Sequence, residues 1–361
     1  MNTFARRAAV ALTATAMAAS LAACGEAGDG DNSSKDNKTI GLLLPESKTT
    51  RYESFDYPLI KAKVAELCSD CKVDYKNASE NVSTQKQQFD DLITSGVKVI
   101  ILDTVDSPSA KAWVQEAADK DVKVVAYDRL AEGPVSAYVS FDNEKVGELQ
   151  GQALVDALGS KAATANVVMI NGKESDPNAA LFKAGAHSVL DTKVGKIVYE
   201  QSGEWDPAVA GQKVGAAITS LGKDGFDAVY SANDGMAGGI IAALESAGIK
   251  NIPVGGQDSE LAALQRILAG TQSFTIYKPY KPEAEKTAEI AVNLLNGKSI
   301  DSLADTKSDS PSNKGIPSSL LQPTVVTKDN IKDTVVKDGL WKASDICTAD
   351  YAAACKAAGI E

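Results

Sequence analysis

Apolar and polar residues are distributed along the chain in two distinct patterns. Short continuous apolar runs, such as residues 39–44, 97–102 and 166–170, are typical of strands buried on both faces. Between them lie segments whose apolar residues recur every three or four positions, such as 109–120 and 207–221, as on one face of a helix. Further strands are predicted at 73–75, 122–127, 196–199, 228–231, 252–254, 274–277 and 320–326. Further helices are predicted at 53–67, 84–94, 178–190, 236–247, 261–269, 282–296 and 330–336, and from residue 144 onward.

This order of elements predicts the fold class. Strands that alternate with helices of about 10 to 15 residues indicate βαβ units and parallel sheets. The 361 residues exceed what one hydrophobic core usually holds, and the predicted strands fall into two similar halves. The sequence therefore predicts an α/β protein with two Rossmann-like, doubly wound parallel-sheet lobes.

The start of the chain has the features of an export signal. Arg6 and Arg7 precede an apolar run over residues 8–19, which is too short to span a bilayer. The following Leu21-Ala-Ala-Cys24 resembles a bacterial lipobox, which implies cleavage after residue 23 and a lipid on the sulfur of Cys24. An ordinary secretory signal with a chance cysteine is the alternative. Residues 24–38 are rich in Gly, Asp, Asn, Ser and Lys, which predicts a flexible tether.

The other four cysteines are Cys68, Cys71, Cys347 and Cys355. Outside the cytoplasm an even number of cysteines favours structural disulfides. Proximity favours the pairs 68–71 and 347–355, although four cysteines allow three pairings. A redox-active CxxC motif and a zinc site are alternatives, but the CxxC motif follows a helical segment, and the chain has one histidine, His187, which we expect to be a bystander.

Polar and aromatic residues gather where the predicted strands end. In open parallel sheets, ligands bind beyond the carboxyl ends of the strands. The residues at these positions are Arg51, Tyr52, Asp128, Arg129, Asp176, Asn178, Trp205, Asn233, Asp258 and Lys278. Carboxylates and amides can accept from sugar hydroxyls, Arg and Lys can donate to them, and aromatic rings can cover the C–H faces. The alternative is that the Asn and Asp residues only cap the following helices.

Composition and motifs argue against several other functions. The net charge of −11 and the absence of a Lys/Arg-rich block argue against binding of nucleic acid. No nucleophile elbow, zinc-protease motif or phosphate-binding loop is present. Asp128 and Asp258 could form a glycosidase pair, but the neighbouring Arg129 would keep Asp128 ionised and unsuitable as a general acid. We therefore expect a binding protein without a cofactor or metal, rather than an enzyme.

Several longer motifs are more specific. They are Ala126-Tyr-Asp-Arg129, Ser140-Phe-Asp-Asn-Glu-Lys-Val-Gly-Glu-Leu-Gln150, Asn178-Ala-Ala-Leu-Phe-Lys-Ala-Gly185, Gly256-Gln-Asp258, Ala269-Gly-Thr-Gln272 with Thr275-Ile-Tyr-Lys-Pro279, and Asn330-Ile-Lys-Asp-Thr-Val-Val-Lys-Asp-Gly339. These motifs resemble those of bacterial D-xylose-binding proteins, over roughly residues 39–340. The members of that family are substrate-binding components of ABC importers with the type I periplasmic-binding-protein fold. The chain departs from the pattern at Tyr52, in the turn 45–50, and in a tail from Ile346 onward.

The resemblance implies two lobes joined by three crossovers, with the sugar between them. The implied N-terminal lobe comprises residues 39–141 and 279–318, and the C-terminal lobe comprises 142–278 and 319–361. The ten strand-end residues named above would contact the sugar. The implied function is that of a monomeric lipoprotein on the outer face of the bacterial cell membrane, which delivers a monosaccharide, first of all D-xylose, to an ABC permease. A module that feeds a sensor kinase or chemoreceptor, or a receptor for another pentose or hexose, is the alternative.

Overall fold

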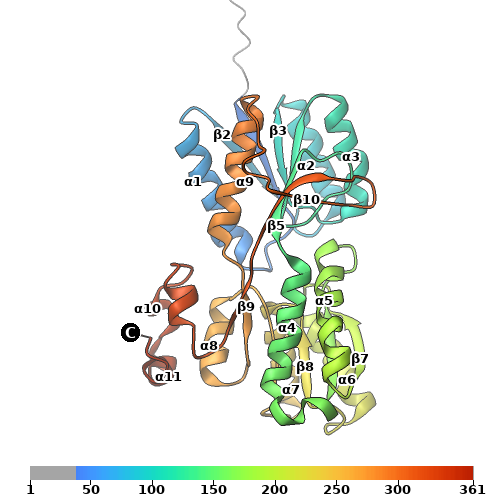
Figure 1. Cartoon of the computed structure of the whole chain (residues 1–361), viewed down its shortest axis with the longest axis vertical. Helices are drawn as coiled ribbons and strands as arrows, with labels where there is room; N and C mark the ends of the chain where they lie inside the picture. Colours follow the sequence, from blue (N-terminus) through green and yellow to red (C-terminus); the bar gives the residue numbers. More distant parts are fainter. Residues whose placement is uncertain (1–37, 361) are drawn as a thin grey trace, which may run out of the picture. The chain divides into compact units, whose positions relative to one another are not determined.

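The computed structural model describes residues 38–360, so the predicted signal peptide, Cys24 and nearly all of the tether lie outside the described residues. Within residues 38–360, no helix has both the length and the apolar composition needed to cross a membrane. The strands form a seven-stranded sheet, a three-stranded sheet and a two-stranded ladder. Figure 1 shows helices packed around each of the two larger sheets.

The first sheet has the strand order β10-β11-β5-β4-β3-β1-β2. Its strands are β1 (Thr39–Leu44), β2 (Lys72–Asn77), β3 (Val99–Leu102), β4 (Lys123–Tyr127), β5 (Ala137–Phe141), β10 (Thr306–Ser308) and β11 (Ile316–Leu321). All neighbours are parallel except β10 and β11. Both faces are covered, because successive side chains of a strand point to opposite sides. Leu42 packs with α1 (Tyr57–Leu67) and α9 (Tyr280–Leu295), whereas Leu43 packs with α2 (Val82–Thr94) and α3 (Ser107–Asp119).

The second sheet is parallel, with the order β7-β6-β8. Its strands are β6 (Asn166–Asn171), β7 (Lys196–Ser202) and β8 (Ala228–Ser231), and Val254 adds a single parallel bridge to Val229. Its helices are α4 (Asn143–Leu158), α5 (Pro177–Lys193), α6 (Pro207–Leu221), α7 (Asp234–Ser246) and α8 (Leu261–Ala269), and the short 3-10 helix η2 (Gly159–Thr164) follows α4. Asp or Asn side chains cap the N-termini of α4, α5, α6 and α7, as the sequence pattern suggests.

Three connections join the two halves. The chain passes from β5 to α4, from β9 (Thr275–Tyr277) to α9, and from β11 to β12 (Thr324–Val326), where β12 pairs antiparallel with β9. This arrangement confirms the predicted fold class of two α/β lobes with a three-strand hinge. The residue limits of the lobes stay a prediction, although β11 pairs with β5 as far as Leu321.

Some elements differ from the sequence prediction. β5 was not predicted, because its five residues directly precede the helical pattern of α4. The predicted strand 320–326 is two strands, and 252–254 contributes one bridge only. Residues 52–56 form a π-helical turn, η1 (Tyr52–Asp56), ahead of α1, and a second one, η3 (Lys332–Val336), follows β12.

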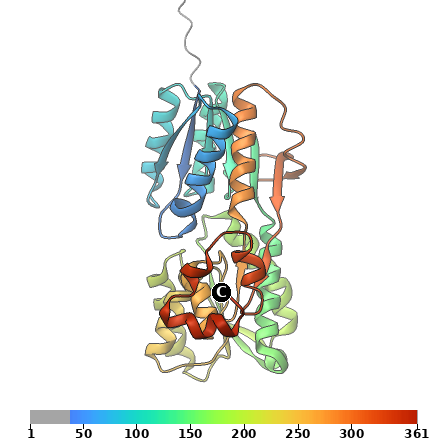
Figure 2. The same ribbon diagram turned by 90° about the vertical axis from the view of Figure 1, so that its left-hand side faces the viewer.

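The C-terminal residues form a compact segment against α8. It contains α10 (Ala343–Ile346), the 3-10 turn η4 (Ala349–Tyr351) and α11 (Ala352–Ala357), and a disulfide joins Cys347 to Cys355. Ile346, Cys355 and Ile360 share a hydrophobic cluster with side chains of α8. Figures 1 and 2 both show these helices beside the second lobe. The other disulfide joins Cys68 to Cys71 at the end of α1.

Candidate functional site

One cavity has a free volume of about 20 Å³, which is room for about one water molecule. Its lining consists of Thr49, Arg51, Tyr52, Asp128, Arg129, Asp176, Asn178, Phe182, Trp205, Asn233, Gln257, Asp258 and Lys278. All ten residues predicted from the strand ends are therefore brought together around this cavity. Three lining residues were not among the ligand contacts expected from the sequence. Gln257 precedes Asp258 in a motif quoted above, Phe182 lies one helical turn after Asn178, and Thr49 has no local signal.

Arg51 holds three buried carboxylates. Its Nε donates to Asp56 at 2.8 Å, its Nη1 to Asp128 at 3.0 Å, and its Nη2 to Glu283 at 2.6 Å. The guanidinium also lies 4.4 Å from the ring centroid of Tyr280. The Arg51 side chain is 2% exposed, and most of its donors are used inside the protein. Arg51 therefore mainly anchors the carboxylate of Asp128.

Asp128 follows β4 with a backbone φ of +54°, a left-handed conformation that costs a non-glycine residue about 1–2 kcal/mol. Three donors hold its carbonyl oxygen: the hydroxyl of Tyr138 at 3.0 Å, the hydroxyl of Ser140 at 2.7 Å and Nδ2 of Asn178 at 3.0 Å. Burial would raise the pKa of Asp128, but the positive charges of Arg51, Lys278 and Arg129 outweigh it and lower the pKa below its usual value. Asp128 is thus an ionised acceptor in the cavity wall.

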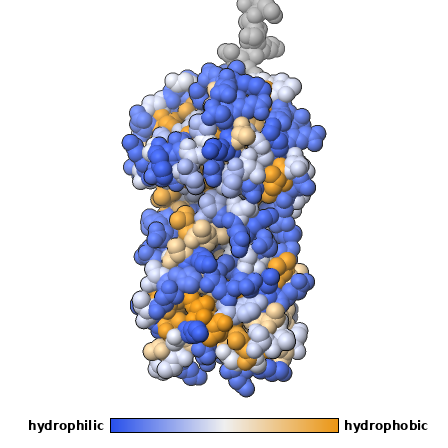
Figure 3. Space-filling model, turned by 90° about the vertical axis from the view of Figure 1, so that its right-hand side faces the viewer, coloured by the Kyte–Doolittle hydropathy of each residue, from blue (hydrophilic) through white to orange (hydrophobic). Residues whose placement is uncertain are grey.

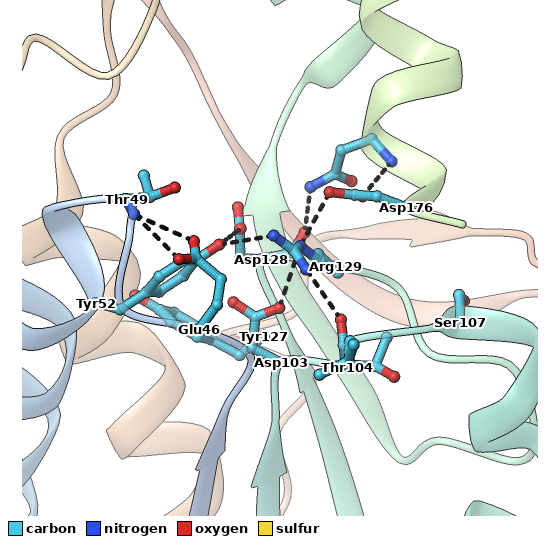
Figure 4. A network of polar contacts seen from close by, with 12 residues as sticks. Glu46, Thr49, Tyr52, Asp103, Thr104, Ser107, Tyr127, Asp128, Arg129 and Asp176 are labelled. Atoms are coloured by element: carbon cyan, nitrogen blue, oxygen red, sulfur yellow. Dashed lines mark hydrogen bonds and ion pairs between the residues drawn. The ribbon is translucent and has the colours of Figure 1, made fainter. Parts of the chain in front are cut away.

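Arg129 lies between two carboxylates, as Figure 4 shows. Its Nε is 2.9 Å from Oδ2 of Asp176 and 3.7 Å from Oδ1 of Asp103, and its Nη2 donates to the hydroxyl of Tyr52 at 3.3 Å. Asp103 was not predicted from the sequence. Neither of its oxygens accepts a hydrogen bond from the described residues, and burial raises its pKa well above the usual range. Burial thus favours the neutral form of Asp103 behind Arg129, and Asp176 is the nearer of the two carboxylates to the Arg129 guanidinium.

The turn before Arg51 is organised by Glu46. This residue is 2% exposed, and its carboxylate accepts from the backbone N–H of Thr49 at 3.1 Å and from that of Lys48. Burial raises the pKa of Glu46, against the positive charge of Arg129 and the hydrogen bonds from the turn. The turn is the segment in which the chain departs from the resemblance, and it places Thr49 in the cavity wall.

Trp205 forms an aromatic wall of the cavity. Its Nε1 donates to Oδ2 of Asp176 at 3.1 Å, and its ring meets the ring of Phe182 edge-on at 6.3 Å. Gly172 permits this placement, because a Cβ atom there would lie 2.0 Å from the indole ring. The other two tryptophans, Trp113 and Trp341, do not line the cavity.

The remaining polar groups come from the second lobe and the hinge. Asn233 accepts from the backbone N–H of Met236 at 2.9 Å, so it caps α7 with its oxygen and retains its amide N–H groups for a ligand. Asp258 has a φ of +96° and lies 2.8 Å from Nζ of Lys278. The capping alternative is thus correct for Asn233, and it does not exclude a place in the cavity wall.

Several contacts join the two sides of the cavity directly. Asn178 donates to the carbonyl of Asp128, Arg129 pairs with Asp176, and Lys48 pairs with Asp206 at 2.6 Å. In each pair, one residue belongs to the first lobe and the other to the second lobe. The structure therefore shows the two lobes closed on one another, with the lining residues 2–8% exposed.

Comparison with known proteins gives the family. Residues 40–299 match the model of the periplasmic binding protein domain. The chain is 38% identical to the D-xylose-binding periplasmic protein of Escherichia coli, over 85% of this chain and 92% of that protein. It is 36% identical to the D-xylose-binding periplasmic protein of Haemophilus influenzae, over 87% and 93%. These two relatives confirm the resemblance inferred from the motifs.

Solved structures agree with this assignment. An ABC transporter solute-binding protein from Clostridium phytofermentans, with bound β-D-glucose, matches with a TM-score of 0.75 and 28% identity, over 85% of this chain and 99% of that one. A carbohydrate transporter solute-binding protein from Chloroflexus aurantiacus, in complex with D-glucose, matches with a TM-score of 0.77 and 26% identity, over 85% and 97%. The family consists of solute receptors rather than enzymes, which confirms the expectation of a binding protein. The chain belongs to the periplasmic binding protein family.

Proposed function

We propose that this protein is an extracytoplasmic receptor that captures a neutral monosaccharide, first of all D-xylose, and delivers it to an ABC importer. The observation that carries the proposal is the composition of the cavity wall. Three cations, Arg51, Arg129 and Lys278, face three acids, Asp128, Asp176 and Asp258, beside the rings of Trp205 and Tyr52. Each of these cations already pairs with one of the acids, Arg51 with Asp128, Arg129 with Asp176 and Lys278 with Asp258. A charged ligand would compete with these buried pairs, whereas a neutral sugar can bond to them as they are.

The same groups account for selectivity among neutral sugars. The ionised Asp128 accepts from a hydroxyl, Lys278 donates to one, and Trp205 covers a C–H face. Hydrogen bonds to charged groups are worth about 1.5–3 kcal/mol each, and an epimer that leaves such a group unpaired loses about that much. The relatives that are 38% and 36% identical are named for D-xylose, which supports this sugar.

A hexose is the second candidate. Two structural neighbours at 26–28% identity hold glucose, and a 32% identical relative is named a multiple sugar-binding receptor. A pentose and a hexose in the pyranose form share a ring and differ by one hydroxymethyl group. The size of the space beside the sugar C5 position is therefore what separates these candidates.

The proposal includes the attachment and the state of the protein. Cys24, which lies outside the described residues, would carry the lipid, and the protein would act as a monomer on the outer face of the membrane. Figure 3 shows one face of the molecule, which is mostly hydrophilic and carries separate hydrophobic patches. Replacement of Cys24 by Ser should release the protein from the membrane fraction or leave it unprocessed.

A thermal-shift screen of the processed protein against pentoses and hexoses tests the ligand. A ligand at about 100 times its Kd stabilises by about 2.7 kcal/mol, so D-xylose should raise the melting temperature clearly. A uronic acid serves as the charged control and should give no shift. A response to glucose without a response to D-xylose would reassign the sugar, and no response to any sugar would refute the proposal.

A further inference from the structure

The loop that carries Asp258 has two consecutive residues in a rare backbone conformation. Asp258 has a φ of +96° and Ser259 a φ of +50°. Non-glycine residues keep such conformations only where their surroundings hold them. Here two side chains donate to the two carbonyls: the hydroxyl of Tyr280 to Asp258 at 2.7 Å and Nε1 of Trp341 to Ser259 at 2.8 Å. Tyr280 begins α9, whereas Trp341 is 82 residues away from Ser259 in the C-terminal region.

Trp341 is held by the C-terminal segment. It packs at the edge of the hydrophobic cluster in which Ile346, Cys355 and Ile360 cover α8. The disulfide between Cys347 and Cys355 closes this segment, and Gln265 of α8 donates to the carbonyl of Ile346 at 3.3 Å. The segment and α8 lie side by side in both Figure 1 and Figure 2. Trp341 is therefore presented to the loop by a packed and covalently closed element.

Trp341 also contacts a residue of the first lobe. The Trp341 ring meets the ring of Phe55 edge-on, at 5.1 Å between centroids and an interplanar angle of 84°. Phe55 lies in η1, between the cavity residue Tyr52 and the Arg51 partner Asp56. Trp341 thus contacts elements on both sides of the cavity without lining it.

We propose that Trp341 is a positioning residue for ligand binding. Its indole N–H holds the Ser259 carbonyl and thereby keeps the Asp258 carboxylate in the cavity wall. Closure of the lobes brings the Trp341 ring against Phe55. The inference rests on the proposed sugar-binding function. It gives the C-terminal segment a role in affinity, although none of the described residues after Lys278 lines the cavity. Loss of the donor leaves a buried carbonyl without its partner, so the loop relaxes in the free protein and binding has to restore it.

The test compares three variants by calorimetric titration with the sugar found in the thermal-shift screen. Trp341→Phe keeps an aromatic ring next to Phe55 and removes the donor, and it should weaken binding about tenfold. Phe55→Leu keeps the donor and removes the ring contact, and it should weaken binding less. Trp113→Phe, in the buried core of α3, is the matched control and should leave the affinity unchanged.

A double-mutant cycle separates positioning from general destabilisation. If Trp341 acts through Asp258, Trp341→Phe should have little further effect in the Asp258→Asn background. An unchanged affinity of Trp341→Phe, or an equal loss in both backgrounds, would overturn the proposal.

Hydrogen exchange of residues 255–260 in the sugar-free protein gives an answer that does not depend on sugar binding. Faster exchange in Trp341→Phe than in the wild type is expected, and identical exchange would reject the positioning role even if the protein bound no sugar at all.

Discussion

Asp128 and Asp258 occupy similar positions in the two halves of the site and are held in different ways. Each follows an extended segment with a positive φ and points a carboxylate into the cavity. Asp128 is held mainly by its own lobe, through Arg51 and Tyr52 on the carboxylate and through the hydroxyls of the β5 strand on the carbonyl. Asp258 is supported by three residues from other parts of the chain: Tyr280 of α9, Lys278 at the hinge, and Trp341, which holds the neighbouring Ser259.

This difference has a consequence for binding. The part of the site around Asp128 is held by its own lobe and keeps its geometry when the lobes open, so it can make the first contacts with a sugar. The part around Asp258 is held by hinge and C-terminal residues and reaches its final geometry when the lobes close. It therefore gives the sugar a higher affinity for the closed state than for the open state. We expect variants of the first half to reduce affinity directly, and variants of the second half to alter closure as well.

The largest effect is expected for Asp128→Asn. The substitution removes an ionised acceptor and leaves Arg51 without one of its three carboxylates, and loss of one member of a buried charge pair costs about 2–5 kcal/mol. Sugar affinity should fall by about a hundredfold or more in calorimetric titration. Asp121→Asn is a matched control, because Asp121 also has a positive φ but its side chain is 87% exposed. An affinity within a few fold of the wild type would exclude Asp128 from the ligand contacts.

The strand ends could be predicted because parallel strands bring their carboxyl ends to one edge. Asp128 directly follows its apolar run, and Asn233 and Asp176 lie two and five residues beyond the ends of theirs. The strand ends therefore place Asn233 and Asp176 at one edge of the second sheet, whereas the position of Asp128 across from them was implied by the family resemblance. The supporting residues could not be predicted in this way. Glu283 pairs with Arg51 across 232 positions, and Asp103 directly follows β3 but has nothing in its local sequence that indicates a place behind Arg129. Their roles arise from tertiary packing, which no local pattern encodes.

The second prediction concerns Trp205 in the second half. Trp205→Ala removes the aromatic face and the hydrogen bond to Asp176, and we expect a loss of affinity of about ten- to fiftyfold. Trp205→Phe keeps a ring and should lose less. Tryptophan fluorescence provides a second readout, since the chain has three tryptophans and Trp113 is buried in the first lobe. A Trp205→Ala protein with full affinity and the full spectral response to sugar would remove Trp205 from the site.

A smaller effect is expected from Glu260, which follows the Asp258 loop. Burial, and next the negative charge of Asp258, raise the pKa of Glu260 from 4.5 to about 7. Between these values the folded protein holds a proton that the unfolded chain has lost. The stability from this group is therefore complete below pH 4.5 and is lost as the pH rises to about 7.

Glu260→Gln removes this dependence. The free energy of unfolding of the variant minus that of the wild type should increase by on the order of 2 kcal/mol from pH 5 to pH 8, because the wild type loses stability over this range. Denaturant titration at each pH measures this difference. Glu245→Gln, on the exposed surface of α7, is the control and should give a constant difference. A constant difference for Glu260→Gln as well would show that Glu260 titrates as an ordinary surface acid.

The smallest effect is expected at the rim, where Lys48 of the first lobe pairs with Glu80 at 2.9 Å and with Asp206 of the second lobe at 2.6 Å. Opening of the lobes breaks only the Asp206 pair, because Glu80 belongs to the same lobe as Lys48. Lys48 is 44% exposed, and exposed ion pairs contribute about 0.2–1 kcal/mol.

Asp206→Asn preserves the cap of α6, since Asn also accepts from the backbone N–H groups there. The variant should therefore raise the Kd of the sugar by no more than about fivefold, mainly through faster dissociation, and 1 M salt should abolish the difference. Glu80→Gln is the counterpart within one lobe and should leave dissociation unchanged. Equal effects of the two substitutions in stopped-flow measurements would mean that the rim pair does not contribute to closure.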